Sequence, residues 1–272
     1  MLYFVEFLLA LIRFLAGAAL FSFMNVVAWR LPRGESPLKG RSRCPACGAV
    51  LGAAELVPVF GWLGLRGRCR HCGVCIPVRY LAVEVLGGAL ALACSARYGA
   101  AATAADGLMG LSWAALWALG VCGVLLAVAL IDAQTQLIPD RLNLTLAVLG
   151  VLSLLTDGVQ TGGWGGLLFD RLAGALCVSV PMLLVALLVP GGFGGGDIKL
   201  MAAAGLFLGW RHTLLAAFLA ILGGGFYGIW LLAAKKADRK AQFAFGPFLC
   251  VGIVTAMLAG EPILHWYFSS FF

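Results

Sequence analysis

The stretch "WAALWALGVCGVLLAVALI", residues 113–131, decides the fold class because it contains no charged residue. A helix needs about 20 consecutive apolar residues to cross the hydrocarbon core of a bilayer. Such runs recur along the 272-residue chain, which is 62% hydrophobic and 11% charged, with a mean hydropathy of +1.00. Because a soluble domain carries about a quarter charged residues, we predict an all-α polytopic membrane protein.

About eight transmembrane helices are predicted, the fourth and sixth of them short: residues 4–29, 80–97, 111–131, 142–156, 167–189, 198–210, 213–234 and 245–268. The first is interpreted as a retained helix, since it lacks the basic region and the cleavage site of a signal peptide. The chain is then expected to consist of a first transmembrane helix (1–29), a small polar insert (30–79) and a membrane domain (80–272).

The distribution of basic residues predicts the orientation in the membrane. Nine of the 19 Lys and Arg residues lie in segment 30–79 and four lie in segment 235–244. Cytoplasmic loops carry such an excess of positive charge, so both segments are predicted to be cytoplasmic and the N-terminus periplasmic. This distribution accounts for the net charge of +7 without a nucleic-acid partner.

Two cysteine pairs in the insert, "CPACG" (44–48) and "CRHCG" (69–73), have the spacing of zinc-binding hairpins. Two C-x2-C hairpins can direct four thiolates at one ion, and a closed S4 shell is typical of structural zinc. A reducing cytoplasm disfavours disulfides; two unrelated pairs of reduced thiols are the alternative. The predicted zinc ligands are four thiols: Cys44, Cys47, Cys69 and Cys72.

Two acids lie at predicted helix ends on the same face of the membrane. Asp132 follows the apolar stretch directly, and Asp197 precedes the segment 198–210. Two carboxylates a few ångströms apart share a proton and polarise a water between them. One acts as the base toward that water while the other protonates a scissile carbonyl oxygen. The pair therefore predicts aspartic-protease chemistry, provided that the fold brings the two residues together.

The helix ends also predict the charge states of these two acids. Asp132 lies at a negative C-terminal end and is expected to be protonated, whereas Asp197 lies at a positive N-terminal end and is expected to be ionised. Other acids have simpler interpretations. Asp140 is expected to cap a helix, and Glu84, inside a span, needs a partner or water. Four acids are predicted in solvated loops: Asp106, Asp157, Asp170 and Asp238.

The glycine run in "GGFGGGDIKL", residues 191–200, directly precedes Asp197. Irregular backbone at membrane depth is tolerated where it is buried in protein or lines a wet cavity. Glycines let a backbone approach an extended substrate closely, although a merely flexible loop is the alternative. A phosphate-binding loop is disfavoured because the GK[ST] element is absent.

Four segments in this order resemble one family. "GGGDIKL" is similar to the GxGD motif of the membrane aspartic proteases that include presenilin. Together with "LIDAQTQLIPD", "SFMNVVAWRLP" (22–32) and the two cysteine hairpins, it resembles the bacterial type IV prepilin peptidases, also called prepilin leader peptidase/N-methyltransferases. The resemblance covers nearly the whole chain.

The resemblance implies an integral inner-membrane enzyme with two activities. Such an enzyme removes the basic leader of type IV prepilins and type II secretion pseudopilins at the cytoplasmic face, and then methylates the new N-terminal residue with S-adenosyl-L-methionine. It implies Asp132 and Asp197 as catalytic residues and the four cysteines as zinc ligands. It also implies a methyltransferase role of the insert, with Glu55, Gly67 and Arg68 at positions linked to methylation.

Two other classes of protein are weighed against this one. A proton-coupled transporter also places carboxylates beside broken, Gly-rich helices, but it is expected to show repeat symmetry and midplane acids. A non-enzymatic assembly scaffold would use the zinc hairpins for docking and would not depend on Asp132 or Asp197. Cleavage of a prepilin by Asp→Asn variants distinguishes the three.

Overall fold

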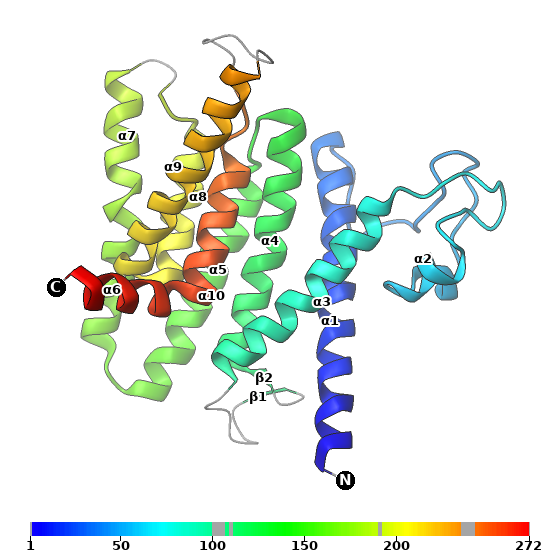
Figure 1. Cartoon of the computed structure of the whole chain (residues 1–272), viewed down its shortest axis with the longest axis horizontal. Helices are drawn as coiled ribbons and strands as arrows, with labels where there is room; N and C mark the ends of the chain where they lie inside the picture. The colour runs from blue at the N-terminus through cyan, green and yellow to red at the C-terminus, as the bar shows by residue number, and fades with distance from the viewer. Residues whose placement is uncertain (1, 100–106, 109–110, 190–191, 235–242, 272) are drawn as a thin grey trace. The chain divides into compact units, whose positions relative to one another are not determined.

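The computed structural model describes residues 2–99, 107–108, 111–189, 192–234 and 243–271 (Figure 1). The chain forms two compact units, residues 1–119 and 120–272, and helix α4 (Trp113–Thr135) begins in the first and ends in the second. The basic segment 235–240 and two of the predicted loop acids, Asp106 and Asp238, lie outside the described residues.

The first unit is built on the long helices α1 (Leu2–Arg30) and α3 (Val78–Tyr98). They approach closely at glycines: a Cβ built on Gly17 would lie 2.3 Å from the carbonyl oxygen of Gly87. Small residues permit such contacts between helices in lipid, where packing replaces the hydrophobic drive. Short elements complete the unit: η1 (Leu31–Arg33), η2 (Ala53–Leu56), α2 (Phe60–Gly64), and the antiparallel pair β1 (Gly107–Leu108) and β2 (Leu111–Ser112).

The second unit is a helical bundle around the short helix α8 (Gly195–Leu208). Leu200, Met201 and Ala204 are fully buried in it. A Cβ on Gly205 would lie 2.2 Å from the carbonyl oxygen of Gly174, so the backbones of α8 and α6 touch. The remaining helices are α5 (Asp140–Thr161), α6 (Trp164–Cys177), α7 (Ser179–Leu188), α9 (Trp210–Ala233) and α10 (Gly246–Phe271).

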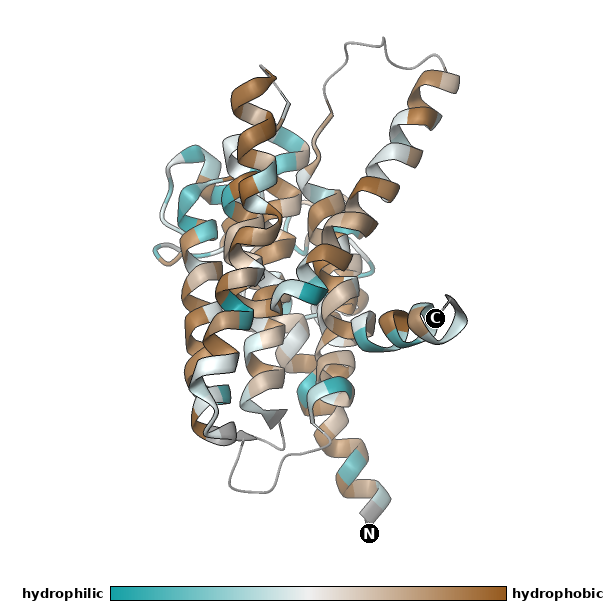
Figure 2. Cartoon of the chain, turned by 90° about the vertical axis from the view of Figure 1, so that its left-hand side faces the viewer, coloured by the Kyte–Doolittle hydropathy of each residue, from teal (hydrophilic) through white to brown (hydrophobic). Residues whose placement is uncertain are grey.

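Seven helical segments of the described chain are long and apolar enough to cross a membrane, which confirms a polytopic membrane protein. The helices are hydrophobic along most of their length (Figure 2), and many of their large apolar side chains are exposed, such as Leu188 at 81%. The sixth predicted segment, 198–210, is not among these seven; it corresponds to α8, whose 14 residues extend only about 21 Å. Helices α6 and α7 together form a single candidate span, Trp164–Leu188.

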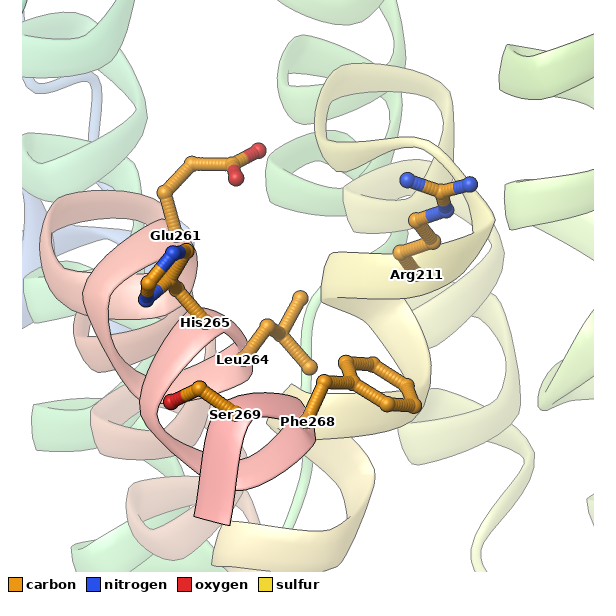
Figure 3. Close-up of a pocket in the computed structure, with 6 residues that line it drawn as sticks. All are labelled: Arg211, Glu261, Leu264, His265, Phe268 and Ser269. Atoms are coloured by element: carbon orange, nitrogen blue, oxygen red, sulfur yellow. The ribbon is translucent and has the colours of Figure 1, made fainter. Parts of the chain in front are cut away.

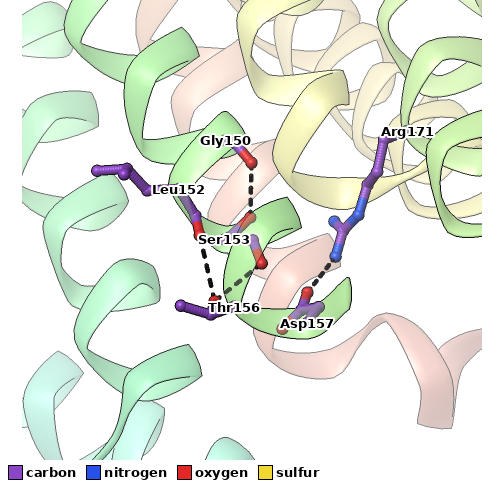
Figure 4. A network of polar contacts seen from close by, with 6 residues as sticks. All are labelled: Gly150, Leu152, Ser153, Thr156, Asp157 and Arg171. Carbon is purple, nitrogen blue, oxygen red and sulfur yellow. Dashed lines mark hydrogen bonds and ion pairs between the residues drawn. The ribbon is translucent and has the colours of Figure 1, made fainter. Parts of the chain in front are cut away.

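The expectation that Asp157 and Asp170 lie in loops is wrong, because both are helical residues of α5 and α6. Asp157 accepts a hydrogen bond from Arg171 Nη2 at 2.8 Å and so joins α5 to α6 (Figure 4). Ser153 and Thr156, in the same part of α5, bond back to carbonyl oxygens of their own helix. Hydropathy underestimated the length of α5 because the predicted segment ended before the charged Asp157, whose partner lies on α6.

Helix α10 changes direction near Pro262, and its last turns run across the axis of its first part (Figures 1 and 2). Proline has no N–H to donate to the carbonyl four residues earlier, and its ring clashes with that carbonyl, so it bends a helix. The segment beyond the bend exposes Trp266, Tyr267 and Phe268.

Candidate functional site

The four cysteines predicted to bind zinc lie together in the structure. The sulfur atoms of Cys44, Cys47, Cys69 and Cys72 all lie within 4.8 Å of one another. The Sγ atoms of Cys44 and Cys72 are 3.9 Å apart. Four sulfurs bound tetrahedrally at 2.3 Å from zinc are separated by about 3.8 Å. The thiols present therefore fit a closed tetrahedral site with only small shifts of their side chains.

The two cysteine hairpins have the same backbone structure. In the first, Cys44 N donates to Ala49 O and Gly48 N to Cys44 O, both at 2.9 Å; in the second, Cys69 and Gly73 repeat the pattern at the same distances. Gly48 and Gly73 each have a φ of +70°, which glycine adopts without strain. The glycine that follows each C-x2-C pair is thus required to close the turn.

Backbone amides in the first hairpin favour the thiolate form of a ligand. The amides of Cys47 and Ala46 lower the pKa of the Cys44 thiol to about 6. The amide of Val74 lowers the pKa of Cys72, but burial and the three neighbouring thiols raise it to about 11. Four thiolates at this spacing therefore require a cation among them, which zinc supplies.

Glu55 and Gly67 both pack on the short helix α2, on different residues. A Cβ on Gly61 would lie 2.5 Å from Glu55 O, and a Cβ on Gly67 would lie 2.6 Å from the Trp62 ring. Gly67 has a φ of +66°, so no other residue type fits there without strain. Arg68 follows it and is exposed.

The Glu55 carboxylate has one oxygen available for a ligand. Its Oε2 accepts a hydrogen bond from Gly52 N at 2.6 Å, whereas Oε1 is buried and has no hydrogen-bond partner. Glu84, predicted to need a partner, accepts a hydrogen bond from Val59 N at 2.7 Å and so ties the loop before α2 to α3. A buried carboxylate oxygen without a donor suits a ligand that is cationic or that donates a hydrogen bond.

Asp132 and Asp197 lie near each other in the second unit, although 65 positions separate them in sequence. Each carboxylate lies close enough for its charge to interact with the other carboxylate and with the buried thiol of Cys250 in α10. Asp132 lies near the end of α4 with 5% of its surface exposed, and Asp197 lies in the first turn of α8. The fold therefore places both carboxylates at helix ends around the start of α10.

The start of α10 contacts Asp132, which the helix ends considered in the sequence did not predict. Gly246 N, in the first residue of α10, donates a hydrogen bond to Asp132 Oδ2 at 2.9 Å. Asp132 thus lies at the positive end of a second helix, just as Asp197 lies at the positive end of α8. The helix ends no longer distinguish the two carboxylates, so the charge states predicted from the C-terminal end of α4 and the N-terminal end of α8 are not retained.

Asn143 of α5 fixes the start of α8 beside the acids. Its Nδ2 donates to Gly196 O at 3.4 Å, while Ile138 packs where a Gly196 side chain would be. Asn143 is 5% exposed, and its Oδ1 has no hydrogen-bond partner. An acceptor for a ligand N–H or a water is therefore available next to the glycine run.

Two aromatic residues border the acids from different segments. Phe193, within the glycine run, and Phe245, directly before Gly246, have ring centroids 6.3 Å apart. Phe245 also stacks on Phe248, at 6.5 Å. The sequence analysis missed this pair. The aromatic run "FAFGPF" (243–248) is the signal that could have drawn attention to it.

Replacing Gly246 by alanine is expected to lower activity at the acids by at least about tenfold, because an added Cβ would lie 2.6 Å from Asp132 Oδ2. The carboxylate would have to move away from the amide that holds it. Gly225→Ala is the matched control, since a Cβ there meets nothing within 4 Å. Equal cleavage rates of a peptide substrate by both variants would contradict this role of Gly246.

The fold and the site define a class: a multi-pass helical membrane protein with paired carboxylates at helix ends and a four-thiol metal-type cluster in a polar insert. Residues 15–98 match the bacterial peptidase A24 N-terminal domain, and residues 119–229 match the type IV leader peptidase family. The chain belongs to the type IV leader peptidase family.

Curated relatives agree with this assignment. A prepilin leader peptidase/N-methyltransferase of Aeromonas hydrophila is 34% identical over 95% of this chain and 93% of its own length. Proteins of the same name from Burkholderia pseudomallei (strain K96243) and Bacillus subtilis (strain 168) are 37% and 30% identical, over 82% and 94% of this chain and 68% and 96% of their own lengths. No solved structure matches the chain.

Proposed function

We propose that this chain cleaves the leader peptide from type IV prepilins or pseudopilins and then methylates the new N-terminal residue. The feature that supports the peptidase activity is the position of Asp132 near the end of α4 and of Asp197 in the first turn of α8, with Gly246 N at the start of α10 bonded to Asp132. The names of the relatives support both activities.

Cleavage proceeds through a water held between the two carboxylates. One carboxylate takes a proton from the water as it attacks the scissile carbonyl carbon, and the other donates a proton to the carbonyl oxygen. Collapse of the resulting gem-diol returns the proton from its hydroxyl to a carboxylate and passes a proton to the leaving amine. The Gly246 amide orients Asp132, and Asn143 Oδ1 accepts a backbone N–H of the substrate.

The two acids act at the cytoplasmic face, with the N-terminus periplasmic. The nine basic residues of segment 30–79 support this orientation through the positive-inside rule. A prepilin has an apolar helix in the bilayer and a basic leader outside it, so its cleavage site lies at the same interface. The partners are therefore the substrate and the lipid bilayer of the inner membrane, without nucleic acid.

Residues 30–79 act as the zinc-binding part of a methyltransferase, and residues 80–272 carry the peptidase. S-adenosyl-L-methionine supplies the methyl group. Glu55, Gly67 and Arg68 are proposed to hold the donor or the acceptor amine, and the buried Oε1 of Glu55 supports this role because it lacks a donor. The exposed Arg68 suits a carboxylate of the donor.

The purified chain in liposomes, supplied with a prepilin and S-adenosyl-L-methionine, tests the two activities together. Mass spectrometry of the product is expected to show the loss of the leader and the gain of one methyl group at the new N-terminus. Intact prepilin after prolonged incubation would overturn the assignment. A cysteine introduced into segment 98–110, compared with the exposed native Cys75 of segment 30–79 and probed with an impermeant thiol reagent, tests the orientation.

Glu55→Gln is expected to lower the rate of methylation by about tenfold or more while leaving cleavage unchanged. The substitution removes the charge and keeps an acceptor for Gly52 N, so the local fold persists. Methylation of a pre-cleaved pilin measures the effect directly. Glu35→Gln, in the exposed segment after η1, is the control. Full methylation by Glu55→Gln would show that Glu55 is not part of the methyl-transfer site.

A further inference from the structure

A pocket lies in the second unit, away from the acids. It has a volume of about 300 Å³ and lies between the first turn of α9 and the bent end of α10 (Figure 3). Glu261 is 15 residues beyond Gly246 on α10, which corresponds to about 22 Å along a helix. The pocket therefore belongs to the opposite end of α10 from Asp132. It is lined by Arg211, Glu261, Leu264, His265, Phe268 and Ser269.

Opposite charges face each other across this pocket. Arg211 projects from α9 on one side, and Glu261 stands on α10 on the other (Figure 3). Among the residues that the structure describes, Arg211 makes no ion pair and lies over the Trp210 ring at 5.5 Å. Glu261 Oε1 lies 3.4 Å from His212 Nε2, and the Glu261 side chain is 63% exposed. Both charges are thus accessible to a ligand that enters between them.

The pocket also has an apolar side and an interfacial setting. Leu264 and Phe268 line it below the two charges, and the adjacent Trp266 and Tyr267 are exposed. Tryptophan and tyrosine gather at the level of lipid headgroups, where one part of the ring is apolar and another is wet. The bend at Pro262 lays this aromatic segment across the helix axis, as expected of a segment in the plane of the interface.

We propose that the pocket binds the headgroup of a phospholipid whose phosphate carries a primary aminoethyl group, as in phosphatidylethanolamine. The Arg211 guanidinium pairs with the phosphate in bidentate geometry. The Glu261 carboxylate accepts hydrogen bonds from the ammonium, and His265 and Ser269 line the same side of the pocket as Glu261 (Figure 3). The acyl chains follow Leu264 and Phe268 into the membrane.

Other headgroups complement the pocket less well. A phosphatidylglycerol headgroup presents no cation to Glu261 and leaves that carboxylate beside a phosphate. A phosphatidylcholine headgroup presents a quaternary ammonium, which has no hydrogen to donate to the carboxylate. A soluble aminoethyl phosphate satisfies both charges but gains nothing from the apolar side of the pocket.

The test uses the full chain, purified from nanodiscs that contain equal amounts of phosphatidylethanolamine and phosphatidylcholine. Retained lipid is measured by native mass spectrometry. The unsubstituted protein is expected to retain phosphatidylethanolamine about tenfold over phosphatidylcholine. Arg211→Gln is expected to lose both lipids, because the phosphate loses its partner. Glu261→Gln is expected to retain both equally, because only the ammonium loses its partner.

Arg97→Gln is the matched control, since Arg97 also lies over a neighbouring ring, that of Tyr98, at 5.4 Å. It is expected to retain lipid like the unsubstituted protein. Unchanged lipid selectivity in Glu261→Gln, or unchanged retention in Arg211→Gln, would overturn the proposal. Displacement of the lipid by glycerophosphoethanolamine at equal concentration would also overturn it, because the occupant would then be a soluble ligand. Leader cleavage is expected to be unchanged in all variants, which shows that they fold.

Discussion

Asp132→Asn and Asp197→Asn are each expected to reduce prepilin cleavage by at least about a thousandfold. General acid and base catalysis contribute up to about 10⁴-fold, and each substitution removes one partner of the pair. Asparagine keeps the size of the side chain, and at position 132 it keeps an oxygen that accepts from Gly246 N. The loss is therefore chemical and is not caused by a cavity. Cleavage is measured by gel shift or mass spectrometry with a prepilin in liposomes.

Asp140→Asn is the control for these two variants. Asp140 lies at the start of α5 and pairs with Lys199 Nζ at 2.8 Å, but its side chain is 72% exposed. An exposed ion pair contributes at most about 1 kcal/mol, so cleavage is expected to remain near the unsubstituted rate. Methylation of a pre-cleaved pilin is expected to survive in all three variants. Full cleavage by Asp132→Asn or by Asp197→Asn would contradict the two-aspartate mechanism.

Cys44→Ser is expected to abolish zinc binding and methylation together. Four thiols within 4.8 Å form the only metal-type cluster in the described part of the chain, and three cannot close the shell. The buried residues of segment 31–79 are two of the ligands, Cys44 and Cys69, and two glycines, Gly61 and Gly67, so no buried apolar side chain is present to replace the ion as a core. In isolated zinc fingers, metal binding contributes on the order of 10 kcal/mol to folding. The readouts are zinc content and protease resistance of segment 30–79.

Cys75→Ser is the control, because Cys75 is an exposed cysteine next to the second hairpin and is not part of the cluster. It is expected to retain one zinc per chain and full methylation. Chelation of zinc from the unsubstituted protein is expected to reproduce the Cys44→Ser phenotype, while cleavage continues. One zinc per chain in Cys44→Ser would contradict the proposed ligand set.

Local sequence patterns predicted what depends on local structure. Hydropathy identified the long helices, and the C-x2-C spacing with its following glycine identified the hairpins that bring the four thiols together. The short length of α8 was predicted, but its burial inside the bundle was not, because a buried apolar helix and a transmembrane helix have the same composition. Asp157 was misplaced because its partner, Arg171, lies on another helix.

Contacts between distant segments explain what the sequence could not predict at the candidate site. The hydrogen bond from Gly246 N to Asp132 joins positions 114 residues apart, and no sequence pattern around either residue predicts it. The buried oxygen of Asn143 and the pairing of Phe193 with Phe245 are of the same kind. They follow from the way α5, α8 and α10 pack.

The short, buried helix α8 has a consequence for biogenesis. With 14 residues, it is shorter than the about 20 that a segment needs to partition into the bilayer by itself. Its backbone contact with Gly174 forms only when α6 is already in place. Helix α8 is therefore expected to leave the translocon together with its neighbours, so that Asp197 reaches its position only as the surrounding bundle assembles.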